Sequence, residues 1–210
     1  MKNNLQRSFL EYVRIKNSPQ DSKLHKETLG EEIDLYGENQ KRIRTILRGE
    51  EIGENEYKRC VLCFVIDQKG NVIVEHKKTG EKDVVSGHIK AYEVGLQAVL
   101  RELYEELGIG IEEGLHAKQL GIIKVILQEA DSKQPCILEI YCLCRTQNTE
   151  IRINKQEIEK IENMPFKIFM TKLLNGKIFP YVKAYDPIVP KLVKQVKEKS
   201  HKKEAIEWER

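Results

Sequence analysis

Three glutamates at helical spacing are the residues of this sequence best suited to chemistry. Glu102, Glu105 and Glu106 stand at i, i+3 and i+4, so a helix places their carboxylates on one face. That face repels itself, and it lies in the last turns, where the helix dipole favours cations. Mg2+ prefers carboxylate oxygens and keeps positions open for phosphate oxygens and water. The spacing therefore indicates a divalent-cation site, with a solvated acidic face as the alternative.

The helix that must position these glutamates is expected from about residue 94 to Gly108. Glycine commonly ends a helix in the left-handed conformation. Apolar residues recur at three- and four-residue spacing on a different face and predict the side that packs against a core. They are Leu96, Val99, Leu100, Leu103 and Leu107. One helix thus carries both a core face and a cation face.

A longer fixed pattern surrounds this helix. Residues 87–109 read GHIKAYEVGLQAVLRELYEELGI, with Gly87 first, Glu93 six residues later and Arg101 directly before Glu102. Every fixed position and spacing resembles the Nudix box, the signature of the Nudix hydrolase family. The resemblance implies an α/β fold: a Nudix α/β/α sandwich with a mixed sheet, in which the box forms a loop–helix–loop.

The resemblance also implies a reaction and roles for the box residues. Nudix hydrolases cleave a nucleoside or other organic diphosphate linked to a group X, with Mg2+ or Mn2+ as cofactor. Glu93 would pair with Arg101 and fix the loop against the helix. One box glutamate, or a later one, would orient or deprotonate water. The metal ligands that the resemblance implies are Glu102, Glu105, Glu106 and a backbone carbonyl at Gly87 in a Ser86–Gly87 turn.

Residues outside the metal helix are candidates for binding the substrate or completing the metal site. A basic loop precedes the box and could grip a diphosphate, with solvated lysines as the alternative. His88 is either a phosphate contact or a turn residue. Many Nudix proteins have an acidic residue facing the metals in the region after the box. The candidates are Lys77, Lys78, Lys82, His88, Glu139, Glu157 and Glu159.

Two other functions stay open: an isopentenyl diphosphate isomerase-like enzyme, and a non-catalytic Nudix ligand-binding or regulatory module. The lead-in DLYGENQKRIRTILRGE resembles that of Nudix proteins close to isopentenyl diphosphate isomerase. Those isomerases carry a catalytic Cys where this chain has Ser86, which has no thiol. Non-catalytic modules usually lose box carboxylates, whereas all three are present here. Both differences favour a hydrolase of a small-molecule diphosphate.

Length and composition suit one domain with extensions or two small domains. The chain has 210 residues, 40% of them hydrophobic. We divide it into an N-terminal extension (1–28, helical or flexible), a Nudix domain (29–185) and a Lys-rich C-terminal helix or tail (186–210). Residues 1–30 carry six basic and three acidic residues and residues 191–210 carry seven and four, so with a net charge of +3 the middle is −3. Without an aromatic–basic RNA motif, basic ends do not predict a nucleic-acid partner.

The N-terminal sequence has no long apolar run, which predicts a cytoplasmic protein with no membrane anchor. Its amphipathic stretch leaves a homodimer open. The five cysteines, an odd number, predict reduced thiols. Strand periodicity sends Cys60 and Cys63 to opposite faces, so this C-x-x-C is not expected to hold zinc, while Cys142 and Cys144 share a face.

Hydrophobic patterning predicts the remaining elements. Residues 30–58 suggest a hairpin or lead-in to the sheet. Strands are expected at 60–66 and 71–76, joined by the turn DQKG, and at 119–128 and 136–145. A helix over 166–174 should stop at Asn175-Gly176, and a second should begin near Ile188. Residues 154–165 are expected to form a loop.

Overall fold

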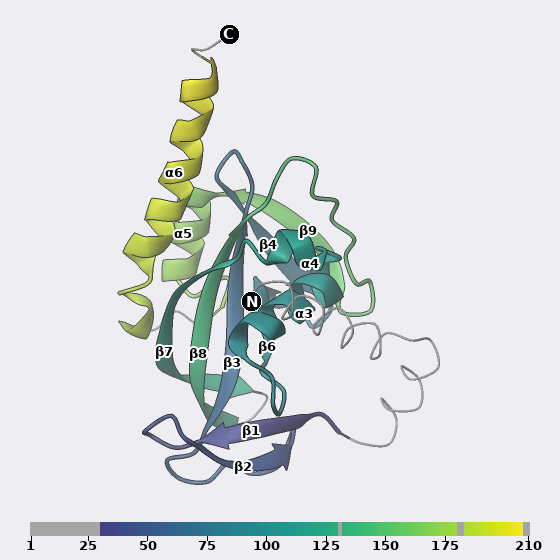
Figure 1. Cartoon of the computed structure of the whole chain (residues 1–210), viewed down its shortest axis with the longest axis vertical. Coiled ribbons are helices and arrows are strands. Elements are labelled where there is room, and N and C mark those ends of the chain that lie inside the picture. Colours follow the sequence, from purple (N-terminus) through teal and green to yellow (C-terminus); the bar gives the residue numbers. More distant parts are fainter. Residues whose placement is uncertain (1–29, 130–131, 180–182, 208–210) are drawn as a thin grey trace, which may run out of the picture.

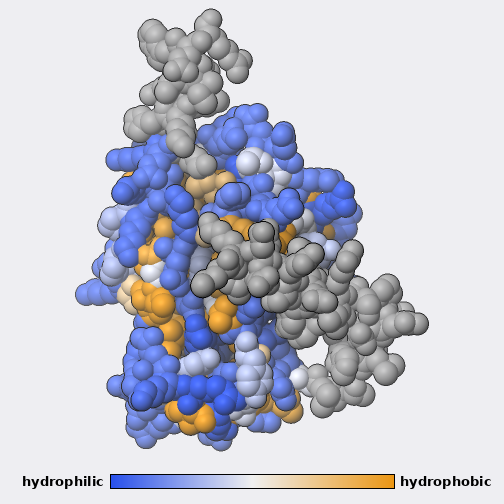
Figure 2. All heavy atoms as spheres, viewed as in Figure 1, coloured by the Kyte–Doolittle hydropathy of each residue, from blue (hydrophilic) through white to orange (hydrophobic). Residues whose placement is uncertain are grey.

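The computed structural model describes residues 30–129, 132–179 and 183–207. The N-terminal extension expected over residues 1–28 lies outside these ranges. Within them, a mixed sheet carries helices on both faces (Figure 1), which confirms the expected α/β/α sandwich. The face shown in Figure 2 is mostly hydrophilic, with apolar side chains in separate patches. In the described ranges, no helix is long and apolar enough to cross a membrane.

The sheet is built around strand β3. It pairs in parallel with β8 on one side, and on the other it pairs antiparallel with β1, β6 and β4 in turn along its length. β2 extends from β1, β7 from β8, and both β5 and β9 from β4. The strands are β1 (Glu32–Tyr36), β2 (Arg42–Leu47), β3 (Tyr57–Ile66), β4 (Asn71–Lys77), β5 (Lys82–Asp83), β6 (Val85–His88), β7 (Lys118–Glu129), β8 (Ser132–Cys144) and β9 (Ile158–Pro165).

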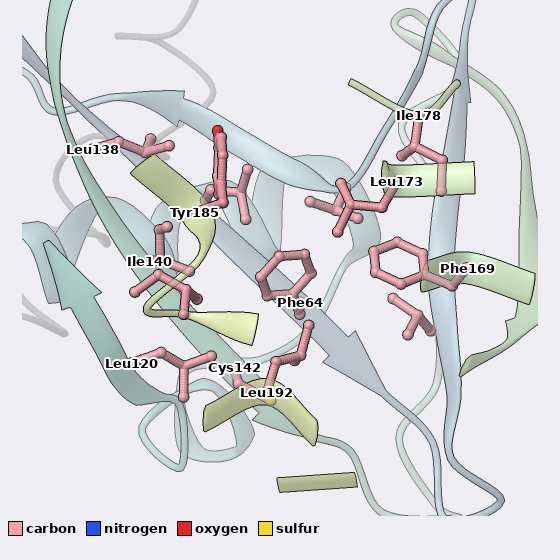
Figure 3. Close-up of a cluster of buried hydrophobic side chains, with 14 of the residues drawn as sticks. Phe64, Leu120, Leu138, Ile140, Cys142, Phe169, Leu173, Ile178, Tyr185 and Leu192 are labelled. Carbon is pink, nitrogen blue, oxygen red and sulfur yellow. The ribbon is translucent and has the colours of Figure 1, made fainter. Parts of the chain in front are cut away.

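The two faces of β3 build two hydrophobic cores because successive side chains of a strand point to opposite sides. Leu62 and Phe64 belong to the first core, which Figure 3 shows, and Val61 and Val65 belong to the second. Helices α5 and α6 and the 3-10 helix η1 contribute to the first core, and α3 to the second. The helical segments are α3 (Gly95–Leu107), α4 (Ile111–Gly114), α5 (Phe166–Leu174), η1 (Lys183–Tyr185) and α6 (Val189–Glu207).

The cysteines lie as strand periodicity predicts. Cys60 belongs to the first core and Cys63 to the second, so the two cannot share one tetrahedral metal ion. Cys142 is buried in the first core and Cys144 packs against it. All five are free thiols in the structure.

Two strand predictions needed correction. The turn after Ile66 joins β3 to β4, but the two strands pair only at Ile66 and Val72, because β6 takes the place beside β3. Strand β9 falls within the expected loop of residues 154–165. It pairs with β4 from Lys77 back to Asn71, yet only Ile158 and Met164 among its side chains are buried. Its backbone forms a strand, although its mainly exposed, charged side chains do not show the alternating pattern from which a strand is predicted.

Helix α6 packs on the same core as the sheet, in the segment where the sequence predicted an amphipathic helix or a Lys-rich tail from residue 186. Leu192 and Val196 are buried in the first core, together with Ile188 before the helix. Figure 1 shows the helix running along the sheet and projecting past it.

Replacing Leu192 with Ala should therefore lower the free energy of unfolding by about 2–4 kcal/mol, because it leaves a cavity in a shared core. Lys194→Ala, on the exposed side of the same helix, is the matched control and should change it by less than about 0.5 kcal/mol. Urea unfolding measures both. Equal effects would show that α6 is not part of the cooperative core.

Candidate active site

Helix α3 has the expected limits. Val94 is its N-cap residue, and Gly108 ends it in the left-handed conformation at φ 66°. Val99, Leu103 and Leu107 are buried, as the apolar stripe predicts. The prediction for Leu96 was wrong: it lies in the first turn and is 36% exposed. The core face of that turn is formed by Gly95 and Ala98 instead.

The three glutamates of α3 line one cleft with a volume of about 1210 Å3. Glu102 and Glu106 are buried, whereas the Glu105 side chain is 47% exposed. Burial raises the pKa of Glu102 to about 7, against the opposing charge of Arg101. Burial, assisted by the negative charge of Glu75, also raises the pKa of Glu106. The helix therefore brings together carboxylates that need positive charge nearby.

Strand β6 forms the edge of the cleft opposite α3. Gly87 lies within this strand and pairs with Val61, so the expected Ser86–Gly87 turn was wrong. Residue 87 must be glycine because the strand passes very close to Glu102: a Cβ atom on residue 87 would stand 1.9 Å from Oε1 of Glu102. The strand can reach the metal helix only where it has no side chain.

The direction of the β6 backbone changes the expected carbonyl ligand. Ile89 donates its N–H to the Arg59 carbonyl of β3 at 2.9 Å. Because alternate residues of an antiparallel strand point to the same side, the Gly87 carbonyl also faces β3 and is engaged in the ladder. The polar groups of Ser86 and His88 face the other way: the Ser86 N–H donates to Glu106 at 3.2 Å, and the His88 carbonyl accepts from Arg101 at 2.8 Å. The geometry thus points to the carbonyl of Ser86 rather than that of Gly87.

Arg101 joins the segment before α3 to the helix. Its Nε and Nη2 donate to the two carboxylate oxygens of Glu93 at 3.0 and 2.9 Å, the bidentate pair that the resemblance implied. Its Nη1 lies 2.6 Å from Glu102 and 3.4 Å from Glu105. Arg101 therefore restrains the Glu102 carboxylate and the β6 edge together.

Arg101→Lys should lower the free energy of unfolding by about 1–3 kcal/mol, because an ammonium cannot make the bidentate contact with buried Glu93. The matched control is Arg152→Lys, which alters a pair with Glu150 whose side chains are both at least 70% exposed. That control should cost less than about 1 kcal/mol. Urea unfolding of both variants would contradict the structural role of Arg101 if the two losses were equal.

Lys77 lies between two buried carboxylates and not in a solvated loop. It is the last residue of β4, and its Nζ stands 2.7 Å from Glu75 and contacts Glu106. These carboxylates raise its pKa, although burial opposes them. Glu75 is fully buried and its oxygens make no hydrogen bond of ordinary geometry to the described residues, so it depends on this ion pair. One ammonium therefore serves two carboxylates.

The other candidates divide into two groups. Lys82, His88 and Glu157 line the cleft with the three glutamates. His88 is buried, and its Nε2 stands 3.1 Å from the Lys58 ammonium. Lys78 and Glu159 are exposed and are not among the described residues that line the cleft.

Glu139 also lies away from the cleft, on β8 near the start of α3. Its carboxylate pairs with Arg59 and accepts hydrogen bonds from Tyr141 and Gln119, both at 3.1 Å. A Cβ atom on Gly95 would stand 2.0 Å from its Oε2. Glu139 therefore supports the position of the helix and does not face the three glutamates.

Sequence reasoning missed two acidic residues near the site. Glu75 follows Ile73 by two residues in a strand and so shares its face toward α3, which period-two counting could have found. Asp83 lines the cleft and accepts hydrogen bonds from the Val84 N–H at 2.8 Å and the Ser86 hydroxyl at 2.9 Å. Burial raises its pKa to about 6. It lies in β5, a two-residue strand too short for sequence patterning.

The residues at this wall fit a divalent cation chemically. Among the described residues, no three His, Cys, Asp or Glu side chains already form a metal-ion site, because Lys77 and Arg101 contact the carboxylates. Carboxylates still outnumber the bases here, and burial and repulsion raise the pKa of two of them. The backbone of β6 passes so close to Glu102 that a side chain cannot fit. Clustered carboxylate and carbonyl oxygens are the donors that Mg2+ and Mn2+ prefer.

Comparisons with solved structures agree with this fold. A crystal structure of DR0079 from Deinococcus radiodurans has a TM-score of 0.58 and 20% identity, over 75% of this chain and 97% of that one. The dihydroneopterin triphosphate pyrophosphohydrolase of E. coli has a TM-score of 0.51 and 14% identity, over 66% of this chain and 98% of that one. At such identities the likeness shows the fold alone. No match was found among curated proteins.

The family is shown by sequence. The NUDIX domain model matches residues 56–185, which include the box, all of the strands from β3 to β9 and helix α5. This span is more than half of the chain. Members of the family generally use divalent metals such as Mg2+ or Mn2+. The matched domain is consistent with the glutamates of α3 and with the close approach of Gly87 to Glu102. The chain belongs to the Nudix hydrolase family of pyrophosphohydrolases.

Proposed function

We propose that this protein hydrolyses an organic diphosphate linked to a group X, with Mg2+ or Mn2+ as cofactor. The observation that carries the proposal is the cleft. Glu102, Glu105 and Glu106 form one of its walls, and the backbone edge of β6 that does not pair with β3 lies beside them. Phosphoryl transfer needs mainly positioning and neutralisation of charge, and both are available at such a wall. A small-molecule diphosphate is the substrate that this arrangement suits.

The proposed metal ligands are Glu102, Glu105, Glu106 and the backbone carbonyl of Ser86. Bound there, Mg2+ or Mn2+ would offset the negative charge that develops on the phosphoryl oxygens. Lys77 restrains Glu106, and Arg101 restrains Glu102, so both carboxylates are oriented before substrate arrives. Restraint of this kind reduces the reorganisation that the reaction requires.

Further residues of the cleft have proposed roles toward the substrate. Lys82 and His88 line the cleft on either side of Ser86, and both are proposed to contact phosphate oxygens. Glu157 lines it from the segment before β9 and its side chain is exposed, so it is available to orient or deprotonate water. Glu105, the most exposed of the three box glutamates, is the alternative base.

A hydrolysis screen, with the products separated by chromatography, tests the proposal. Purified protein is assayed with Mg2+, with Mn2+ and with EDTA against nucleoside diphosphate sugars, dinucleoside polyphosphates, nucleoside triphosphates and alkyl diphosphates. Glu105→Gln should abolish most of the metal-dependent activity, whereas Glu112→Gln should not. Glu112 is an exposed glutamate of α4 outside the cleft and serves as the matched control. The proposal fails if no diphosphate is hydrolysed, or if activity is equal with EDTA.

A further inference from the structure

The cleft has a second wall that hydrolysis of the diphosphate does not require. This wall is apolar and lies on the face of the sheet that carries the first core. Three of its residues, Leu138, Ile178 and Tyr185, lie along one side of that core in Figure 3. The residues that line this wall are Cys60, Leu62, Val125, Leu138, Ile178, Phe179 and Tyr185.

Strand β6 connects this wall to the glutamates of α3. Ser86 pairs with Leu62 and His88 pairs with Cys60, and paired residues of antiparallel strands share a face. The side chains of Ser86 and His88 therefore stand on the side of the apolar wall, while Gly87 faces Glu102. In the described part of the chain, β6 pairs only with β3, so its other edge is open to the cleft. A ligand lying across this edge reaches both walls at once.

The chemistry of the apolar wall limits what it can bind. Its side chains are aliphatic or aromatic apart from the Cys60 thiol and the Tyr185 hydroxyl, with Ser86 and His88 at its β6 edge, and no Asn or Gln lies among the described residues of the cleft. Sugar hydroxyls placed against it would lose hydrogen bonds to water, at roughly 1–3 kcal/mol for each unpaired group. Alkyl or aryl groups would be favoured there because their burial needs no polar partner. Most charged residues of the cleft, by contrast, lie toward α3 or at the two ends of β6, with Asp83 and Lys82 at one end and Lys90 and Arg48 near the other. Lys177, next to Ile178, is the charged residue beside the apolar wall.

We propose that the apolar wall binds group X and that X is an uncharged apolar group, alkyl or aryl, carried on the diphosphate. The inference rests on the proposed function, because the α3 glutamates fix where the diphosphate lies. A cleft of about 1210 Å3 exceeds the roughly 300–1,000 Å3 typical of small-ligand pockets, so it has room for both parts. Phe179, half-buried on the segment after α5, is the residue best placed to determine specificity.

Binding is measured with methylene-bridged diphosphonate analogues, which cannot be cleaved between the phosphorus atoms. Isothermal titration with Mg2+ compares methyl, butyl, hexyl and octyl esters, a phenethyl ester, and the corresponding ribosyl analogue. Each added methylene should tighten Kd by about fourfold until the wall is covered, which corresponds to about 0.8 kcal/mol per buried CH2. The ribosyl analogue should bind no more tightly than the methyl ester. A phenethyl ester that binds more tightly than octyl would identify X as aryl, and the reverse order would identify it as alkyl.

Two variants of one residue separate the wall from the fold. Phe179→Ser should flatten the dependence of Kd on chain length, and Phe179→Leu should retain it, because leucine preserves the apolar surface. Ile168→Ser, at a 48% exposed position on α5, is the matched control and should behave as the wild type. If Phe179→Ser does not fold, the Leu variant and the wild-type series still test the inference.

The outcomes distinguish this inference from the proposed function. A Kd that is independent of chain length, or a preference for the ribosyl analogue, overturns the inference even if diphosphates are hydrolysed. Conversely, chain-length-dependent binding without hydrolysis of any diphosphate would support the apolar wall and overturn the hydrolase proposal.

Discussion

Glu106→Gln is expected to lower kcat/KM for the hydrolysed diphosphate by about 10³-fold, with the protein as stable as the wild type. The amide has the shape of the carboxylate and can still accept from the Ser86 N–H, but it carries no charge. A neutral ligand weakens the cation that must offset phosphoryl charge, and losses of about 10²–10³ are typical when such stabilisation is removed. Stability should not fall, because the substitution also ends the repulsion between Glu106 and Glu75 and leaves Lys77 paired with Glu75.

Two measurements on this variant separate catalysis from folding. Steady-state kinetics over a range of Mg2+ concentrations should show the loss with a raised metal requirement, and urea unfolding should show a free energy within about 0.5 kcal/mol of the wild type or above it. Glu112→Gln, exposed on α4, should leave both quantities unchanged. Activity of Glu106→Gln within a few-fold of the wild type would remove Glu106 from the metal site.

Gly87→Ala is expected to have the second large effect, because residue 87 has no space for a methyl group. The added Cβ would stand 1.9 Å from Oε1 and 2.2 Å from Cδ of Glu102. Either the Glu102 carboxylate leaves its position or β6 separates from α3. Overpacking of this kind costs about 1–3 kcal/mol, and a carboxylate displaced by about 1 Å costs about 10²-fold in rate. Kinetics and urea unfolding measure the two effects.

Gly110→Ala provides a matched control for this substitution. Nothing lies within 4 Å of a Cβ atom on Gly110, and its φ of −66° suits any residue. The control should change stability by less than about 1 kcal/mol and leave activity intact. The double variant Gly87→Ala with Glu102→Ala should recover most of the stability but none of the activity, because the shorter side chain removes the clash and the ligand together. A Gly87→Ala protein with normal rate and stability would contradict the close approach.

Part of the fold and of the site could be predicted from the sequence pattern. The helix limits and the faces of the cysteines follow from periodicity, which depends on residues near one another in the chain, and the Glu93–Arg101 pair follows from the resemblance to the Nudix box. Leu96 was assigned to the core by the same counting, but only the position of the sheet decides that the first turn of α3 presents Ala98 instead. Strand β9 was missed because its pairing with β4 uses backbone groups, while its polar side chains carry no alternating signal.

The sequence alone determined the chemistry of this protein: three carboxylates at i, i+3 and i+4 within a fixed pattern, and therefore the family, the expected metal and the class of reaction. The tertiary structure decided which atoms meet. It placed Gly87 in a strand against Glu102, turned the Ser86 carbonyl outward, brought Lys77 between Glu75 and Glu106, and set Glu139 apart from them. Contacts such as these join strands that are distant in the sequence. The register of those strands, and the face on which each side chain lies, are fixed by the packed sheet as a whole and not by local spacing.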